Sequence, residues 1–252
     1  MSYGEFSLYY DELMQNADYK GLAEYLLELF GRFSGKIPEN ILDIACGTGS
    51  LDVELAKKGI QVIGCDSSEE MLLRAREKAD ENPDCDLFFL RQKMHELDML
   101  HLVDGAVCTF DGLNHITNTR QLEDVFFRLH LFVRPGGLFI FDVNTPYKHE
   151  KILADNAFVF ETDDIYCVWQ NRYIKSSRSV DITIDMFVPD ENTGRYERHF
   201  ESFKERAYTK RQIEKIINDS GFEILGIFGE RSFLKPEAQE QRVFYVTKRK
   251  EN

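Results

Sequence analysis

The chain has 252 residues, of which 43% are hydrophobic and 30% charged, and its formal net charge is −13 at pH 7. This length allows one large domain or two small ones, and the composition is typical of a soluble globular protein with a sizeable core. The acidic balance argues against a broad nucleic-acid-binding surface, because such surfaces need clustered cations. A local basic patch around Lys204, Arg206, Lys210 and Arg211 stays open as an alternative, although such charges are more typical of solvated surface.

The cysteines and the N-terminus indicate the compartment. The cysteine count is odd and no pair is spaced as Cys-x-x-Cys, so the sequence predicts neither a disulfide framework nor a structural zinc site. The first residues are polar and acidic, unlike a signal peptide, and no uncharged apolar run approaches the length of a membrane span. We therefore expect a cytoplasmic protein with reduced cysteines and no membrane partner.

The first 156 residues alternate between helical and strand patterns. Five short apolar runs are typical of buried strands, and the segments between them show helical periodicity or N-cap residues. Such alternation implies right-handed crossovers and a parallel sheet. We expect a helix over 9–33, a helix over 50–58 with Ser50 as a candidate N-cap, and a helix opened by a capping box from Ser67 to Glu70. The expected strands are 41–45, 61–66, 87–90, 105–110 and 138–143.

The pattern changes at about residue 157. From 158 to 208 the chain is rich in aromatic and β-branched residues, which predicts three or four antiparallel strands, with 180–188 and 195–207 as a long hairpin. A helix is expected from Thr209 to Asp219, followed by strands near 222–230 and 241–248. We expect residues 1–156 and 209–252 to form an α/β core, and 157–208 to form an inserted antiparallel β subdomain.

A turn of small residues joins the first strand to the following helix. Glycines there allow the backbone to approach a ligand closely. The N-terminus of a helix favours ligand groups that accept hydrogen bonds from its free N–H groups. A dinucleotide-binding turn would have a third glycine where this chain has Asp52, in the first turn of the helix. That carboxylate would repel a pyrophosphate, so the turn favours a nucleotide-like cofactor without phosphates.

Segment 42–49, LDIACGTG, resembles the first motif of the class I S-adenosylmethionine-dependent methyltransferases, with alanine in place of the first glycine. The resemblance implies a Rossmann-like, seven-stranded, mostly parallel sheet and S-adenosylmethionine as the cofactor. It also implies that the turn borders the methionine and ribose parts of the cofactor. The candidate residues of this segment are Asp43, Ala45, Gly47 and Gly49.

Asp66 ends the second strand and matches the family's acid that binds the ribose hydroxyls. An ionised carboxylate can accept hydrogen bonds from both vicinal hydroxyls, although a strand-end acid can also be a simple helix cap. Ser67 and Met71 follow it as further cofactor candidates. The third motif departs from the family pattern, because Lys93 stands where an acid often accepts from the adenine amino group. Adenine recognition then falls to backbone groups, Gln92 or packing by Met94.

The exit of the fourth strand, 110–115, borders the transferable methyl group and the acceptor in the resembling family. Phe110 is a cofactor candidate, and His115 is the candidate general base, with packing in the loop as the alternative role. Asp111 either orients a cationic acceptor or holds the loop by an Asx turn. No Asn/Asp-Pro-Pro-Tyr/Phe motif and no Pro-Cys pair is present, and Cys108 is expected in the core. No histidine pair has metal-ligand spacing, so we predict no metal.

The N-terminal cluster of Tyr and Phe resembles the start of sugar-amine N-methyltransferases, in which such a helix folds over the cofactor. Tyr10 is the candidate that closes the site, with core packing as the alternative. The same enzymes carry an antiparallel insertion that forms the acceptor pocket and sometimes a dimer contact, which leaves monomer and homodimer open. Aromatic residues that could line such a pocket are Tyr166, Trp169, Tyr173, Phe187, Phe200 and Phe203.

Together these observations predict methyl transfer from S-adenosylmethionine to nitrogen or oxygen of a small-molecule acceptor. Two alternatives stay open. A tRNA or rRNA methyltransferase is disfavoured by the acidity of the chain and by the lack of an appended RNA-binding domain. A non-catalytic S-adenosylmethionine-binding regulator would keep the fold and Asp66 but lack a working acceptor site.

Overall fold

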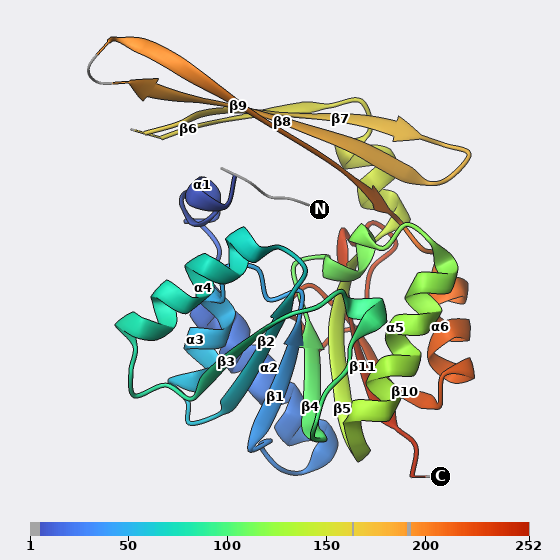
Figure 1. The fold of residues 1–252 in the computed structure, drawn as a ribbon. Coiled ribbons are helices and arrows are strands. Elements are labelled where there is room, and N and C mark those ends of the chain that lie inside the picture. The colour runs from blue at the N-terminus through green and yellow to red at the C-terminus, as the bar shows by residue number, and fades with distance from the viewer. Residues whose placement is uncertain (1–5, 163, 191–192, 252) are drawn as a thin grey trace.

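The computed structural model describes residues 6–162, 164–190 and 193–251. They form an α/β core around a seven-stranded sheet, and a separate four-stranded antiparallel sheet that lies across one end of it (Figure 1). This arrangement confirms the predicted α/β class and the predicted antiparallel addition. Among the described residues, no helix combines the length and the apolarity that a membrane span requires.

The strand order of the large sheet is β10-β11-β5-β4-β1-β2-β3. The five strands from β5 to β3 are parallel, while β11 pairs antiparallel with both β5 and β10. Parallel strands end at a common edge, and ligands bind at that edge in folds of this kind. The strands are β1 Asn40–Ile44, β2 Gln61–Asp66, β3 Leu87–Arg91, β4 Val103–Cys108, β5 Val133–Asn144, β10 Phe222–Gly229 and β11 Arg242–Arg249.

Helices cover both faces of this sheet. On one face, apolar side chains of α2 (Tyr19–Ser34) and α3 (Ser50–Ala56) pack on the sheet, with α4 (Glu69–Glu81) beside α3 and β3. On the other face lie α5 (Thr119–Phe132) and α6 (Lys210–Asp219). The amphipathic spacing noted in the sequence therefore places each helix against the sheet by its apolar side.

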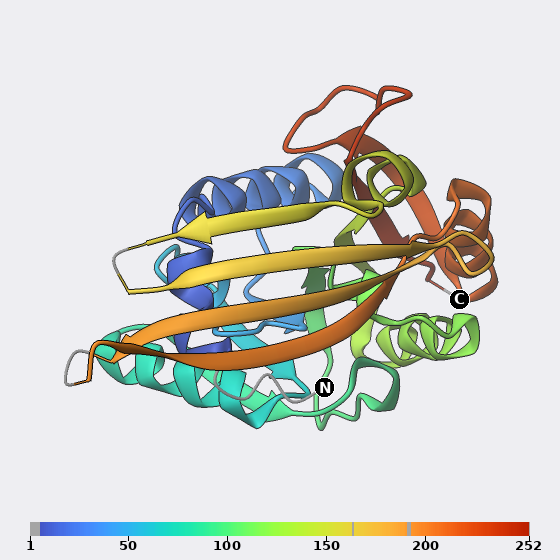
Figure 2. The same ribbon diagram turned by 90° about the horizontal axis from the view of Figure 1, so that it is seen from above.

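The four-stranded sheet, called the cap sheet below, consists of β6 (Ala157–Glu161), β7 (Tyr166–Ile174), β8 (Ser179–Asp190) and β9 (Arg195–Arg206). A π-helical turn at Lys148–Leu153 joins β5 to it. Seen from above, its long strands cross the core, and α1 (Phe6–Leu13) lies beneath them (Figure 2). One face of the cap sheet is buried against α1, Met71 of α4 and the π-helical turn. Its buried members are Cys167, Val180, Ile182, Ile184 and Met186.

Several local predictions are corrected by the structure. The expected helix 9–33 is two helices, because the chain turns at 14–18 and Asp18 caps α2 by accepting from Gly21 N. Helix α3 is preceded by Gly49 in the left-handed region, and Ser50, the expected N-cap, instead donates to Asp11. Ser68, not Ser67, caps α4. Helix α6 begins after Thr209, where the sequence places the start of a helix, and Thr209 and Gln212 form a capping box there.

Candidate active site

The turn after β1 is held by backbone hydrogen bonds and left-handed backbone conformations. Ala45, Gly47 and Gly49 have φ values of 68°, 57° and 72°. The amides of Ala45 and Cys46 both donate to the carbonyl of Cys65, at 2.7 and 3.1 Å, which ties the turn to the end of β2. Ala45 adopts a conformation that favours glycine, so the alanine of the first motif is held there against its preference.

Asp66, the ribose candidate, lies directly opposite this turn. Its Oδ2 accepts from Gly47 N at 3.0 Å and its Oδ1 accepts from Ser68 N at 2.8 Å. Burial raises the pKa of Asp66, while these amides oppose the rise. Each oxygen keeps a lone pair beyond the one that accepts an amide, and the residue lines a cavity. The carboxylate can therefore accept hydrogen bonds from a vicinal diol, as ribose recognition requires.

The two glycines of the turn have different roles. A Cβ at Gly47 would meet nothing within 4 Å, so this position is open toward a ligand. A Cβ at Gly49 would lie 3.0 Å from Cβ of Ala75 and 3.1 Å from the ring of Phe89. Gly49 is therefore required where α3, α4 and β3 pack closely, and it does not line the cavity.

Two buried carboxyl groups lie under the turn. Asp52 is fully buried, and a Cβ at Gly64 would lie 2.6 Å from its Oδ2, so its side chain points toward β2 and not toward a ligand. Burial raises the pKa of Asp52 to about 7, and burial together with Asp52 raises that of Asp43 well above its ordinary value. Asp52 therefore does not face a ligand, and the fit of the site to S-adenosylmethionine rests on Asp66, which lines the cavity and can accept from the ribose hydroxyls.

The cavity beside the turn has a volume of about 90 Å³. It brings together eight of the predicted site residues from five parts of the chain. Those eight are Tyr10, Asp43, Ala45, Gly47, Asp66, Met71, Phe110 and His115. The predicted residues that do not line it are Gly49, Ser67, Gln92, Met94 and Asp111.

The two adenine candidates are engaged elsewhere. The side-chain amide of Gln92 donates to the Asp98 carbonyl at 2.9 Å and accepts from the Asp98 amide at 2.7 Å. Met94 packs against the hydrophobic cluster between the sheet and α5. Lys93 pairs with Glu96 at 3.2 Å. None of these contacts tests adenine binding, so the roles of Gln92 and Met94 in binding adenine stay predictions.

Helix α1 closes over the turn through a cluster of polar contacts. Asp11 accepts from Thr48 Oγ1 at 2.7 Å and from Ser50 Oγ at 3.1 Å, and it pairs with Lys78 Nζ at 2.5 Å. Tyr10, next to Asp11, lines the cavity, and burial raises its pKa. Tyr10 thus lines the cavity, its role in closing the site stays a prediction, and Lys78 is a contact that the sequence alone did not indicate.

The exit of β4 is a strained loop held by a buried ion-pair cluster. Phe110 and Asp111 both have positive φ values, 52° and 57°. Their amides donate to Asp142 at 2.8 and 2.7 Å, and Arg242 pairs with Asp111 at 2.5 Å and with Asp142 at 2.7 Å. Asp111 forms no Asx turn here, so that alternative is wrong, and its carboxylate is oriented by Arg242.

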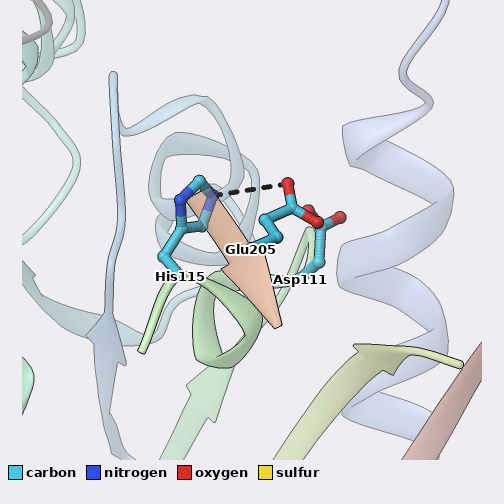
Figure 3. A group of neighbouring side chains, drawn as sticks. All are labelled: Asp111, His115 and Glu205. Carbon is cyan, nitrogen blue, oxygen red and sulfur yellow. Dashed lines mark ion pairs between the residues drawn. The ribbon is translucent and has the colours of Figure 1, made fainter. Parts of the chain in front are cut away.

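Glu205, from β9 of the cap sheet, lies close to both His115 and Asp111. Figure 3 shows these three side chains converging, with His115 Nε2 4.0 Å from Glu205 Oε1. One ligand atom from each of the three lies within 4.8 Å of the others. Burial raises the pKa of Asp111 to about 6. Burial acts in the same direction on Glu205, but His149, His115 and Asn144 outweigh it and lower the pKa to about 2.

Sequence reasoning missed Glu205, Arg242 and Asp142. Glu205 pairs with Val180, and burial along β9 alternates from 199 to 205, so strand periodicity could have placed Glu205 on the inner face. The residues around Glu205 in the sequence are also charged, so the sequence did not single it out as a buried position. For Arg242 and Asp142 no sequence signal links the two strands.

The aromatic residues of the cap sheet divide between its faces. The ring of Phe203 packs at a tilt against that of His115, with ring centroids 5.1 Å apart, and Trp169 lies beside Phe203. Tyr166 and Phe200 are exposed, and Phe187 pairs with Tyr166 on the same outer face. The expectation that these last three line a pocket next to His115 is therefore wrong, because adjacent residues of a strand point to opposite faces.

Comparisons with known proteins agree with this geometry. Residues 41–137 match the family model described as a methyltransferase domain. The chain is 31% identical over 249 residues, 99% of its length and 100% of the relative, to a Geobacillus sp. (strain WCH70) protein named as a methyltransferase with no acceptor stated. A solved S-adenosylmethionine-dependent methyltransferase from Clostridium acetobutylicum ATCC 824 is 29% identical and superposes with a TM-score of 0.88, covering 98% of this chain and 99% of that one.

More distant structures share the fold. Streptomyces venezuelae DesVI has a TM-score of 0.75 at 18% identity, covering 95% of each chain. CalS10 from Micromonospora echinaspora, an amino pentose methyltransferase solved with S-adenosylmethionine bound, has a TM-score of 0.76 at 14% identity, covering 96% of each chain. The match to the methyltransferase domain and the 29%-identical S-adenosylmethionine-dependent enzyme confirm the predicted cofactor, S-adenosylmethionine. With the first-motif turn, the strand-end acid and these matches together, the chain belongs to the class I S-adenosylmethionine-dependent methyltransferases.

Proposed function

We propose that the enzyme methylates the nitrogen of a small-molecule amine, bound as an ammonium between Asp111, His115 and Glu205. The observation that carries this proposal is the convergence of two carboxylates and an imidazole beside the cofactor cavity. The sequence left nitrogen and oxygen open. A neutral hydroxyl offers one donor and no charge, so it would leave most of these acceptors unmatched, the buried Glu205 among them.

The spacing of the three groups favours an ammonium. Three tetrahedral N–H donors with hydrogen bonds of about 2.8 Å place their acceptors about 4.6 Å apart. The three acceptor atoms lie within 4.8 Å of one another, and the His115–Glu205 pair is separated by 4.0 Å. Adjacent ligands of a transition metal, bound at about 2.1 Å, lie only about 3.0 to 3.4 Å apart. We therefore assign the group to a cation with N–H donors and not to a metal.

The chemistry requires a base, because an ammonium has no lone pair. His115 Nε2 takes one proton from the acceptor nitrogen, and the freed lone pair attacks the methyl carbon as the carbon–sulfur bond breaks. S-adenosylmethionine supplies the methyl group as a sulfonium, which leaves as a neutral thioether. Glu205, ionised and 4.0 Å away, stabilises the imidazolium that forms. The methylated amine then carries the positive charge.

The cap sheet supports a small acceptor. Residues 157–208 are proposed as a substrate-cap subdomain, because Glu205 and Phe203 on its inner face are adjacent to His115. Two relatives carry amine acceptors in their names, the dTDP-3-amino-3,6-dideoxy-alpha-D-glucopyranose N,N-dimethyltransferase of Streptomyces fradiae and the glycine/sarcosine N-methyltransferase of Parasynechococcus marenigrum, at 26% and 21% identity. These names support nitrogen as the acceptor atom.

An RNA acceptor is less well supported. Of the basic residues suggested by the sequence, Lys204 pairs with Asp181, Lys210 with Glu214, and Arg206 donates to the Thr117 carbonyl. Cations engaged in this way leave less charge for a phosphate backbone. A non-catalytic regulator would not need a base and two carboxylates at the methyl end of the cavity. All five cysteines are free thiols, which supports the cytoplasm as the location, and we propose a monomer or a homodimer.

A paired acceptor screen tests the proposal. Amino sugars and amino acids are each offered beside the analogue with hydroxyl in place of the amine, and beside bulk tRNA, with labelled S-adenosylmethionine. We expect turnover of at least one amine and none of its hydroxyl analogue. His115→Asn is expected to lower kcat about 100-fold or more, since general base catalysis contributes about 10²–10⁴.

The matched control is Glu197→Gln, an exposed position on the same strand as Glu205. This variant is expected to keep wild-type rates, whereas Glu205→Gln is expected to raise the KM of the amine. Preferred turnover of the hydroxyl analogue or of tRNA would show that the amine assignment is wrong.

A further inference from the structure

His149 is a fully buried histidine that belongs to no motif of the sequence. It lies in the π-helical turn between β5 and the cap sheet, and none of its surface is exposed. Its Nε2 lies 3.3 Å from Oε2 of Glu205, within ion-pair distance, but neither Nε2 nor Nδ1 makes a hydrogen bond of standard geometry among the described residues. A π-helical turn is rare and frequently occurs at functional sites.

The two oxygens of Glu205 face different partners. Oε2 faces His149 and also accepts from the side-chain amide of Asn144 at 3.2 Å. Oε1 faces His115. His149 and Asn144 thus occupy one side of the carboxylate and leave the other side for the acceptor.

The amide of Asn144 cannot reverse this arrangement. Its Oδ1 accepts from Lys148 Nζ at 2.9 Å, so its Nδ2 is the group directed at Glu205. Lys148 and His149 are neighbours in the same π-helical turn. Two residues of that turn therefore act on Glu205: His149 contacts it directly, and Lys148 acts through Asn144.

We propose that His149 is a positioning residue for the acceptor: it binds Oε2 of Glu205, fixes the side chain in one rotamer, and keeps Oε1 ionised and directed toward the acceptor nitrogen. This inference rests on the proposed function for its substrate, but the pairing of His149 with Glu205 exists without any acceptor. A buried carboxylate is stable as an anion only while donors compensate its lost hydration. Without His149, Glu205 takes up a proton and no longer attracts an ammonium.

The first measurement needs no acceptor. In enzyme labelled with 13C at the glutamate carboxyl carbon, the Glu205 signal is identified by its loss in Glu205→Gln. We expect the wild-type signal to be that of a carboxylate at pH 7. His149→Phe, which removes the ring nitrogens but fills the space, is expected to move this signal toward the protonated form. His149→Gln, which keeps an N–H donor, is expected to leave it largely ionised.

The second measurement separates binding from structure. His149→Phe is expected to raise the KM of the amine at least tenfold, to change kcat by less, and to leave the affinity for S-adenosylhomocysteine within twofold of wild type. His149→Gln is expected to recover most of the KM. The control is His101→Phe, in an exposed loop, which is expected to change none of these quantities.

The outcomes are distinguishable. If the Glu205 signal and the KM both stay at wild-type values in His149→Phe, the positioning role is wrong. If the signal moves as expected but no amine is methylated by wild type, the positioning role holds and the proposed amine acceptor is wrong. If His149→Phe does not fold, the 15N signal of His149 Nε2 in folded wild type and Glu205→Gln decides, and an unchanged signal overturns the pairing.

Discussion

The guanidinium of Arg242 lies 2.5 Å from a carboxylate oxygen of Asp111, although 131 residues separate them along the chain. The same guanidinium pairs with Asp142, which accepts the amides of Phe110 and Asp111. A strand that is antiparallel to its neighbours thus fixes the loop that carries the candidate base. Because Phe110 and Asp111 both have positive φ, this ion-pair cluster stabilises a conformation that the chain alone would not favour.

Replacing Arg242 with Met tests this cluster. The substitution leaves Asp111 and Asp142 buried without their cation, and breaking a buried pair costs about 3 to 5 kcal/mol. We expect urea denaturation at pH 7.5 to show a loss of this size in the free energy of unfolding. Arg76→Met, at an exposed position on α4, is the control and should change stability by less than about 0.5 kcal/mol. Equal stability of the two variants would refute a structural role of the cluster.

Asp66→Ala is expected to weaken binding of S-adenosylhomocysteine about 10- to 100-fold, as measured by calorimetry. The reason is that hydrogen bonds to a charged group each contribute about 1.5 to 3 kcal/mol, and the ribose hydroxyls would lose theirs. Glu69→Gln, at an exposed acid three residues away, serves as the control. An unchanged dissociation constant for Asp66→Ala would remove Asp66 from the cofactor site.

The buried pair of Asp43 and Asp52 makes stability depend on pH. The pKa of Asp52 is raised to about 7 in the folded state, above its ordinary value of 3.8. The folded state therefore binds more protons than the unfolded state between these values, and stability falls as pH rises through that window, by up to about 4 kcal/mol. Below pH 4 both states are protonated, and the stabilisation is fully present.

Urea denaturation at pH 5.5 and 8.5 without cofactor measures this effect. Wild type is expected to lose stability between the two values, and Asp52→Asn is expected to lose less because it cannot ionise. Asp80→Asn, exposed on α4, should behave as wild type. Parallel pH dependence in Asp52→Asn and wild type would show that the pair does not titrate in this range.

Metal removal provides a further test. The separation of His115 Nε2 and Glu205 Oε1, 4.0 Å, is wider than adjacent metal ligands require, so dialysis against EDTA is expected to leave methyl transfer unchanged. Rates are measured before and after dialysis, and again after addition of Zn²⁺ or Mn²⁺. Loss of activity that a divalent cation restores would reverse the assignment of this group to an ammonium.

The cofactor end of the site was accessible to sequence reasoning because it is local. The turn 45–49, Asp66 and Met71 follow consecutive strands and helices, and parallel strands bring their ends to one edge whatever the rest of the chain does. Short-range patterns also placed Tyr10 and His115 at the cavity. The sequence pattern did not identify the N-cap of α4 correctly, because Ser67 and Ser68 are adjacent and either could cap the helix.

The acceptor end depended on long-range pairing. Glu205, Arg242 and His149 reach Asp111 and His115 only because β9, β11 and the π-helical turn meet above the exit of β4. No local propensity encodes these contacts, since each side chain lies in an unremarkable charged segment of its own strand or turn. The sequence by itself therefore determined the fold class and the methyl donor. Only the tertiary structure brought together the residues of the proposed acceptor site, because charges there are compensated by partners from distant parts of the chain.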